Sequence, residues 1–304
     1  MKILVTGANG FIGSALSKKL LEMEQNVVGI ARSHSGFLKD EILDSKKFNF
    51  LKLDLGKDNL EQLDEDIDVI VNLASQQPNN KNIDWKDFYM SNVQAIRNIC
   101  KFASNRDIKQ VISVSSTAVL QTENYEQYNE HSKMNPITPY GYSKCLGEYN
   151  IRKFSESKNK TQYTILRFPS VFGKNHLGGI IYTIYELASK DLNIELYDNG
   201  EKLRNLLYIS DAVDSILKCI FKMKELGRFE LFQVGSSNSL KMNEITQIII
   251  DKVDSKSKVI PIEKPTNQNN ISLNLSKLNN QLDFKTMSIK EGIDLYIKEK
   301  QHEI

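Results

Sequence analysis

Short apolar runs alternate with amphipathic stretches over the first 170 residues of the chain. Runs rich in Val, Ile and Leu predict buried strands, and stretches with an apolar residue at every third or fourth position predict helices. The predicted strands cover residues 2–6, 26–31, 48–53, 69–75, 110–116 and 163–168, and the predicted helices between them cover 12–24, 85–104 and 140–154. This alternation indicates a parallel sheet with helices on both faces.

The pattern changes after Gly173. Helices are predicted at 180–187, 211–224, 242–253 and 288–298, and strands at 193–197 and 229–234. The strand at 229–234 can extend the first sheet, which predicts a smaller second domain that is interleaved with the first. We expect residues 1–173 and 209–236 to form a larger domain around this sheet. Residues 174–208 and 237–304 would then form a smaller C-terminal α/β domain.

Composition describes an ordinary globular protein and excludes several classes of function. The chain has 304 residues, of which 40% are hydrophobic and 26% charged. Its 40 basic and 38 acidic residues give a net charge of +2, so nothing favours nucleic acid as a partner. The chain starts in a predicted strand and no apolar run has membrane length, so we expect a cytoplasmic protein that does not bind membranes.

Cysteines and histidines indicate neither a disulfide framework nor a metal site. Cys100, Cys145 and Cys219 are odd in number and contain no CxxC pair, and the four histidines show no ligand spacing. Such cysteines suit a reducing compartment as buried, inert thiols.

A glycine-rich turn joins the first predicted strand to the first predicted helix. Gly7, Gly10 and Gly13 follow the strand, and the helical pattern begins at Ile12. A helix N-terminus beside a backbone without side chains can hold a pyrophosphate through N–H groups and the helix dipole. An ordinary tight turn is the alternative, but the flanking strand and helix favour a dinucleotide site.

A tyrosine and a lysine four residues apart form the candidate catalytic pair. Tyr140 and Lys144 would share one face of a helix that starts after Pro139. A nearby ammonium favours the phenolate and lowers the pKa of a phenol, which makes it usable as an acid or base. The fifth strand ends in Ser115-Ser116, which can supply a hydroxyl to orient a substrate oxygen.

Motifs spread over most of the chain are similar to those of one family. They are Gly7-x-x-Gly10-x-x-Gly13, Asp54-Leu55, Asn72-Leu73-Ala74, Asn92, Ser115-Ser116, Tyr140-x-x-x-Lys144, Leu166-Arg167, Val171-Phe172-Gly173, Gly200-x-x-x-Arg204, Tyr208-Ile209-x-Asp211 and Val234-Gly235. In this order they resemble the extended short-chain dehydrogenases/reductases, and most of all the NAD-dependent epimerase/dehydratase family that acts on nucleotide sugars. The resemblance implies a Rossmann-type doubly wound parallel sheet.

The resemblance also implies roles for individual residues. Tyr140 would be the general acid/base, Lys144 would assist it and bind the nicotinamide ribose, and Ser116 would supply the active hydroxyl. The residues of the cofactor site would be Gly7, Gly10, Phe11, Ile12, Gly13, Arg32, Asp54, Leu55, Leu73, Ala74, Tyr140 and Lys144, with no metal. Arg204 would grip the diphosphate of the sugar nucleotide, and Ser170 would lie at a substrate-contacting position.

Two departures from the family pattern narrow the expected reaction. Ala31 and Arg32 stand where a ribose-binding acid is expected, which favours NADP(H) over NAD(H), because an arginine can pair the 2′-phosphate. The alternative is that Arg32 only faces solvent. Thr117 and Ala118 replace the acid and base of the 4,6-dehydratases, so dehydration is not expected.

The predicted function is an NAD(P)-dependent oxidoreductase acting on a nucleotide-linked sugar, with a 4-ketoreductase preferred. A 4-epimerase that retains NAD is the alternative, and a non-catalytic NAD(P)-binding sensor or scaffold is a more distant one. The family resemblance further implies a homodimer formed through a four-helix bundle, to which helices 85–104 and 140–154 would contribute. Apolar residues on more than one face of the first of these helices suit that expectation: Phe88, Val93, Ile96, Ile99 and Phe102.

Overall fold

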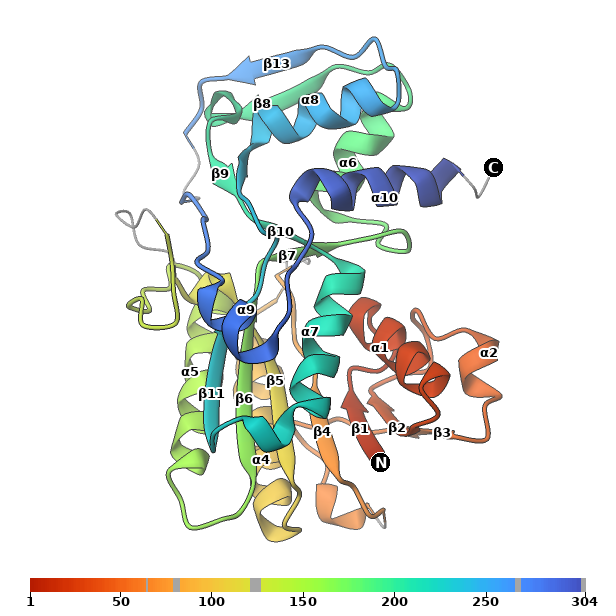
Figure 1. Cartoon of the computed structure of the whole chain (residues 1–304), viewed down its shortest axis with the longest axis vertical. Coiled ribbons are helices and arrows are strands. Elements are labelled where there is room, and N and C mark those ends of the chain that lie inside the picture. Colours follow the sequence, from red (N-terminus) through yellow and green to blue (C-terminus); the bar gives the residue numbers. More distant parts are fainter. Residues whose placement is uncertain (64, 79–82, 121–126, 266–268, 302–304) are drawn as a thin grey trace. The chain divides into compact units, whose positions relative to one another are not determined.

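The computed structural model describes every residue of the chain except 64, 79–82, 121–126, 266–268 and 302–304. The chain divides into two compact units (Figure 1). The first consists of Met1–Leu120, Met134–Arg167 and Val213–Phe232, and the second of Gln121–Lys133, Phe168–Ala212 and Gln233–Ile304. Neither unit is therefore one continuous stretch of sequence.

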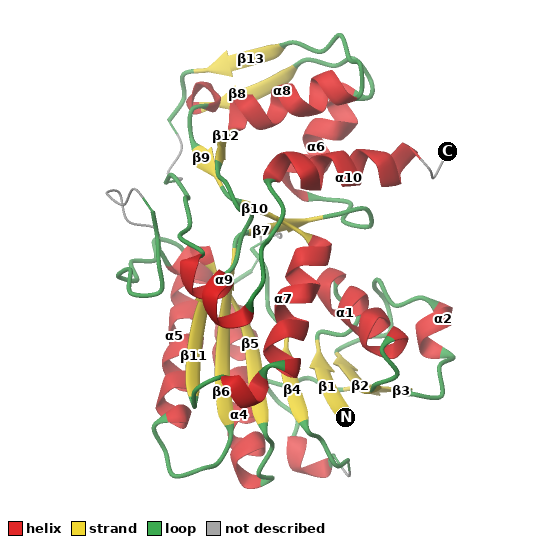
Figure 2. Cartoon of the chain, in the orientation of Figure 1, coloured by secondary structure: helices red, strands yellow, loops and turns green. Residues whose placement is uncertain are grey.

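A seven-stranded sheet forms the centre of the first unit (Figure 2). In spatial order its strands are β11 (Phe229–Gln233), β6 (Gln162–Phe168), β5 (Gln110–Ser116), β4 (Val69–Asn72), β1 (Lys2–Thr6), β2 (Asn26–Ala31) and β3 (Phe48–Lys52). Neighbouring strands from β3 to β5 pair in parallel. The sheet has β2 and β3 on one side of β1, and β4, β5, β6 and β11 on the other side. This order confirms the predicted doubly wound α/β fold, in which ligands generally bind at the carboxyl ends of the strands where the order reverses, here β1 and β4.

Helices between the strands cover this sheet. They are α1 (Phe11–Glu22), α2 (Asp40–Leu43), α3 (Trp85–Tyr89), the π-helical turn η2 (Met90–Gln94), α4 (Ala95–Asn105), α5 (Pro139–Ser155) and α7 (Ile209–Phe221), with 3₁₀ turns η1 (Leu60–Gln62), η3 (Thr117–Val119) and η5 (Met223–Glu225). Ile99 of α4 and Ile151 of α5 share a buried cluster with Ile70 of β4. Burying one such side chain contributes about 1.5 to 3 kcal/mol.

The apolar residues proposed for a dimer face turn out to pack within the chain. Each of the five is at most 5% exposed: Phe88, Val93, Ile96, Ile99 and Phe102. They belong to the core of the first unit because the helices carrying them lie on its sheet. The large apolar side chains that α3 and α5 do expose are Trp85, Tyr89, Tyr142, Leu146 and Tyr149. Any contact with a second copy through these helices would therefore use this second set.

The second unit has its own small sheets and its own core. Its strand pairs are β7 (Ser170–Phe172) with β10 (Leu206–Tyr208), β8 (Ile194–Tyr197) with β13 (Val259–Ile262), and β9 (Leu203–Arg204) with β12 (Leu240–Lys241). Its helical elements include α6 (Gly179–Ala188), η4 (Asp198–Gly200), α8 (Met242–Lys252), α9 (Ser276–Leu282) and α10 (Ile289–Gln301). Ile184, Ile249 and Ile293 bring α6, α8 and α10 into one buried cluster.

Two kinds of feature do not occur in the described part of the chain. No helix there combines the length and apolar composition needed to cross a bilayer. No group of three or more His, Cys, Asp or Glu side chains in that part is placed to hold a metal ion.

Candidate active site

The glycine turn after β1 folds tightly on itself. Gly7 has a φ of +66°, in the left-handed region that favours glycine. The Gly10 amide donates to the Gly7 carbonyl oxygen at 2.9 Å, and a Cβ at Gly13 would lie only 2.1 Å from that oxygen. Helix α1 begins at Phe11, with Ile12 next, and its N-cap residue Gly10 has no side chain. The turn therefore presents an uncapped helix N-terminus, which suits an anionic ligand.

The loop after β2 is held beside this turn by Asn9. Its Nδ2 donates to the carbonyl oxygens of Ser33 at 2.8 Å and Ser35 at 2.5 Å. Ala31 is buried at the end of β2, whereas Arg32, the next residue, is exposed. The residues that directly follow β2 thus include one guanidinium, that of Arg32, and no carboxylate.

The carboxyl end of β4 is bound to the glycine turn through Thr6. The amides of Leu73 and Ala74 each donate to Thr6 Oγ1 at 3.2 Å, and that hydroxyl donates to Asn72 Oδ1 at 2.7 Å. A Cβ at Gly7 would be 2.9 Å from the Ala74 nitrogen. No side chain separates Gly7 from Ala74, so the predicted cofactor residues that follow β1 lie beside those that follow β4.

Asp54 and Leu55 lie beyond the end of β3. Asp54 Oδ1 accepts from the amide of Gly56 at 3.1 Å, and its Oδ2 lies 3.4 Å from Lys57 Nζ. Leu55 is 5% exposed and belongs to the same apolar cluster as α4. Asp54 thus stabilises the turn, and Leu55 anchors it in the core.

Helix α5 positions the candidate catalytic pair. Thr138 caps the helix by accepting from the Gly141 amide at 3.1 Å, and Pro139 occupies its first turn. Tyr140 is half-buried, and Lys144 is 4% exposed. Lys144 Nζ lies 6.0 Å from the centre of the Tyr140 ring. The structure therefore brings Tyr140 and Lys144 together, and the ammonium of Lys144 lies on the side of α5 that faces the sheet.

The two serines at the end of β5 differ in their surroundings. Ser115 is 7% exposed, and its hydroxyl donates to Glu148 Oε1 at 2.5 Å. Ser116 is half-buried, and its hydroxyl accepts from the Ala118 amide at 3.1 Å. Successive residues of a strand point to opposite faces. The Ser115 hydroxyl is thus bound to the buried carboxylate of Glu148, and Ser116 is the serine that remains for the candidate site.

A buried asparagine on the π-helical turn completes the surroundings of Lys144. Asn92 Oδ1 accepts from the Ser75 hydroxyl at 3.0 Å and from the Gln76 amide at 2.8 Å. Its Nδ2 donates to Ser143 Oγ at 2.9 Å. The Ser75 hydroxyl in turn lies 3.4 Å from Lys144 Nζ as an acceptor. Asn92 therefore fixes Ser75, and π turns of this kind are frequent at functional sites.

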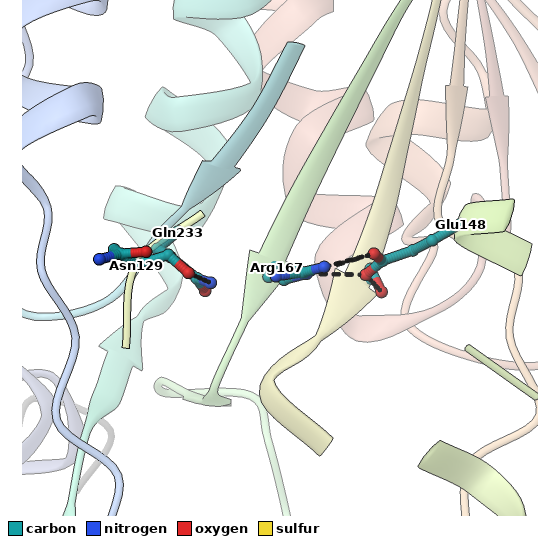
Figure 3. A network of polar contacts seen from close by, with 5 residues as sticks. Asn129, Glu148, Arg167 and Gln233 are labelled. Atoms are coloured by element: carbon teal, nitrogen blue, oxygen red, sulfur yellow. Dashed lines mark hydrogen bonds and ion pairs between the residues drawn. The ribbon is translucent and has the colours of Figure 1, made fainter. Parts of the chain in front are cut away.

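A buried ion pair lies next to this group. Arg167 on β6 donates from Nε to Glu148 Oε1 at 2.9 Å and from Nη2 to Oε2 at 2.7 Å (Figure 3). The sequence analysis gave no role to Glu148, Ser75 or Asn92. Glu148 could have been found, because it follows Lys144 at the same four-residue spacing that separates Lys144 from Tyr140.

The two predicted substrate residues belong to the second unit. Ser170 is exposed on β7, where it is the register partner of Leu206. Arg204 Nη1 donates to the carbonyl oxygens of Leu203 at 2.9 Å and Asn269 at 3.0 Å. Burial lowers the pKa of Arg204, and the charge of Asp198 partly offsets this effect. The Arg204 guanidinium is thus oriented by main-chain oxygens.

Comparisons with known proteins agree over most of the chain. Residues 3–235 match the family model described as NAD dependent epimerase/dehydratase family. The uncharacterized UDP-glucose epimerase YtcB of Bacillus subtilis (strain 168) is 28% identical over 309 residues, which cover 96% of this chain and 96% of that protein. The dTDP-4-dehydro-6-deoxyglucose reductase of Escherichia coli is 27% identical over 315 residues, 97% of this chain and 96% of that protein.

A solved structure gives the same picture of the fold. The crystal structure of UDP-glucuronic acid 4-epimerase from Bacillus cereus in complex with UDP-glucuronic acid and NAD superposes with a TM-score of 0.87. The sequence identity is 21%, and 100% of each chain is covered. At this identity the likeness concerns the fold alone.

Proposed function

The chain belongs to the NAD-dependent epimerase/dehydratase family, and from this premise we propose that it is a nucleotide-sugar 4-ketoreductase. It moves a hydride from a nicotinamide cofactor to carbon 4 of a nucleotide-linked keto-hexose. The observation that carries the hydride-transfer activity is the hydrogen bond from Lys144 Nζ to Ser75 Oγ, 3.4 Å long. Ser75 follows Leu73 and Ala74, which pack on the glycine turn, so the candidate catalytic pair and the candidate cofactor turn meet at one edge of the sheet.

The surroundings of the glycine turn fit a dinucleotide. Among the described residues, leaving out the neighbours of Gly10 in the chain, a Cβ at Gly10 would meet only the Gly7 oxygen, at 3.1 Å. The backbone there can therefore approach a pyrophosphate closely. The residues that would hold the cofactor are Gly7, Gly10, Phe11, Ile12, Gly13, Arg32, Asp54, Leu55, Leu73, Ala74, Tyr140 and Lys144. When bound, the nicotinamide ring supplies the hydride.

The chain's own residues supply the proton and the orientation. Tyr140 donates its phenolic proton to the substrate oxygen at carbon 4 as that carbon is reduced. The ammonium of Lys144 stabilises the negative charge left on the phenol. Ser116 hydrogen-bonds the same substrate oxygen and holds it toward Tyr140. The substrate's diphosphate is assigned to Arg204, whose planar guanidinium suits a bidentate contact, and Ser170 is assigned to the sugar.

Arg32 favours NADP(H) and therefore a reductase. A guanidinium at the end of β2 can pair a 2′-phosphate, whereas the neutral hydroxyl of NAD offers it no charge partner. A reductase exchanges its spent cofactor with the NADPH pool, whereas an epimerase retains its cofactor through both half-reactions.

A 4-epimerase that retains NAD is the second candidate. It is favoured by one of the named relatives, because YtcB is described as a UDP-glucose epimerase. In this case Tyr140 first removes a proton from the hydroxyl at carbon 4 and later returns it, and Lys144 and Ser116 keep their roles.

Two assays on the purified chain separate these functions. In the first, a dTDP-4-keto-6-deoxyhexose is incubated with NADPH or NADH, and loss of absorbance at 340 nm is followed. In the second, UDP-glucose or UDP-glucuronic acid is incubated without added cofactor, and the 4-epimer is measured by chromatography. Stoichiometric NADPH consumption in the first assay supports the reductase. Epimer formation without NADPH consumption supports the epimerase, and cofactor binding without turnover in either assay supports a sensor or scaffold.

A further inference from the structure

Three polar residues recur at every fourth position of α5. Tyr140 and Lys144 form the candidate catalytic pair, and Glu148 is the third. Residues four apart lie one above the other on the same side of a helix. The Glu148 side chain is only 5% exposed, and the proposed chemistry does not use it. Its place on this row therefore requires another explanation.

Glu148 is bound by two strands of the sheet. The Ser115 hydroxyl on β5 donates to its Oε1 at 2.5 Å, and the Arg167 guanidinium on β6 faces both carboxylate oxygens (Figure 3). One helical turn earlier, Lys144 Nζ donates to the carbonyl oxygen of Val114 at 2.9 Å. Val114 and Ser115 are consecutive residues of β5. Two successive turns of α5 are thus tied to two successive residues of one strand.

Stability does not explain this ion pair well. The Arg167 side chain is 3% exposed, and its Nη1 has no hydrogen-bond partner among the described residues. Removing two charges from water costs about as much as their attraction returns, and a well-packed apolar pair in the same place is often neutral or stabilising. What such a pair does supply is a defined geometry, because a bidentate contact fixes both distance and direction.

Helix α5 needs such a constraint, because the first unit packs on only one side of it. On its outer side, Tyr142 is 53% exposed and Tyr149 is 55% exposed. On its inner side, Gly147 lets the helix approach η2 so closely that a Cβ there would be 2.8 Å from the Asn92 carbonyl oxygen. Such a close contact sets the separation of the helices, whereas directional polar contacts set the register along the axis: against η2 the bond from Asn92 to Ser143, and against the sheet the contacts of Glu148.

We propose that Glu148, Arg167 and Ser115 are positioning residues that set the register of α5 against β5. Through that register they place Tyr140 and Lys144 relative to Ser116, which follows Ser115 on the same strand. This inference rests on the proposed function only for the roles of Tyr140, Lys144 and Ser116. A displacement of about 1 Å between reacting groups can lower turnover by about a hundredfold, so the register of one helix has a large effect on rate.

The double variant Glu148→Leu/Arg167→Met tests the proposal, because it removes both charges and keeps side-chain volume. We expect it to fold, with a thermal midpoint within about 4 °C of wild type, since an apolar replacement of a buried pair costs little. We expect kcat on the sugar that wild type converts to fall about tenfold or more, with a much smaller change in KM. We also expect its crystal structure to show α5 shifted along β5, so that the distance between Tyr140 and Ser116 changes.

The control is Lys153→Met, a variant on the same helix. It removes an exposed ion pair with Glu156 and should change none of these quantities.

Each result decides the inference. A folded double variant with wild-type kcat, or with α5 in the wild-type register, overturns it. If the double variant does not fold, Ser115→Ala replaces it, because that change removes only the hydroxyl between β5 and Glu148. Ser115→Ala should lower kcat and Ser115→Thr should restore it, whereas wild-type turnover by Ser115→Ala overturns the proposal. The crystallographic comparison needs no turnover, so a wild type that converts none of the sugars counts against the proposed function alone.

Discussion

Lys144 donates a hydrogen bond from its Nζ to the main-chain oxygen of Val114, 2.9 Å away. Val114 lies on β5 two residues before Ser116, so the lysine is held by the strand that carries the candidate hydroxyl. A main-chain acceptor cannot be altered by mutation of its side chain. The position of the Lys144 ammonium therefore depends on how α5 packs against β5. The predictions for the catalytic residues depend on the same packing.

Tyr140→Phe tests the general acid. The change keeps the ring, whose centre lies 6.2 Å from that of Phe88, and removes only the hydroxyl. We expect kcat to fall by about 10² to 10⁴, the usual contribution of general acid–base catalysis. The dissociation constant of the reduced cofactor, measured by fluorescence, should change far less than kcat, because the other residues of the cofactor site still bind it. A Phe variant with wild-type turnover would exclude Tyr140 as the acid.

Arg32 tests the cofactor preference. The double change Ala31→Asp/Arg32→Asn places a carboxylate where it can accept from ribose hydroxyls and repel a 2′-phosphate. Charge-assisted hydrogen bonds contribute about 1.5 to 3 kcal/mol, so wild type should bind NADPH roughly tenfold to a hundredfold more tightly than NADH. The double variant should reverse this order when both dissociation constants are measured at one salt concentration.

A matched control for this experiment is Lys39→Met. It removes a positive charge from an exposed residue of the same stretch, just before α2, and should leave the preference intact. Equal affinity of the wild type for NADH and NADPH would show that Arg32 takes no part in cofactor binding, and the argument for a reductase would lose its main support.

The exposed side of α5 tests the predicted homodimer. Leu146 is 41% exposed and Tyr149 is 55% exposed, although both are large and apolar. We expect wild type to sediment as a dimer at micromolar concentration and Leu146→Glu/Tyr149→Glu to sediment as a monomer, because a helix bundle cannot bury two like charges without partners. Leu177→Glu, at a residue of the second unit that is 69% exposed, should remain dimeric. A monomeric wild type would refute the prediction.

The three cysteines should react slowly in the folded protein. Burial raises the pKa of Cys145 to about 12, and the charge of Glu148 adds to this effect. Burial also raises the pKa of Cys100 and of Cys219. At pH 8 only about one Cys145 in ten thousand would then be a thiolate, the reactive form. Titration with a thiol reagent should show three reactive groups in denaturant and a slow reaction without it, whereas a rapid native phase of one thiol would contradict the prediction.

Much of the first unit was predictable, because most of its strands are buried on both faces and therefore consist of nearly continuous apolar runs. The predictions for β1, β2 and β5 have the observed bounds. The predicted helix over 85–104 is divided by η2. The spacing of apolar residues does not reveal a π turn, because the turn is accompanied by a hydrogen bond from the Gln76 amide, in a distant segment, to Asn92.

The second unit was harder to predict, because its elements depend on pairing between distant segments. Strands β9 and β12 have two residues each, too few for a pattern. β13 contains Pro261, and α9 lies in an Asn-rich stretch for which no helix was predicted. In each case a segment elsewhere in the unit stabilises a strand or helix that the local sequence does not favour.

The spacing of Tyr140 and Lys144 correctly predicted a shared helix face, and the buried position of Lys144 could not be read from it. The pairing of Glu148 with Arg167 was also not predicted, because the two residues belong to different elements and only the tertiary fold brings them together. Buried charges of this kind are visible in a sequence only as exceptions to an apolar pattern.

The order of strands in the sheet has a consequence for synthesis of the protein. β6 ends at Phe168, and its outer neighbour β11 begins at Phe229. Residues 169–228 must therefore leave the ribosome before the growing sheet can be completed, which takes about 3 to 12 s at ordinary rates of translation. During that interval β6 is an unpaired edge that can template association with another nascent chain. Neighbouring ribosomes on one messenger RNA bring such edges together, so aggregation of this protein should begin on the polysome.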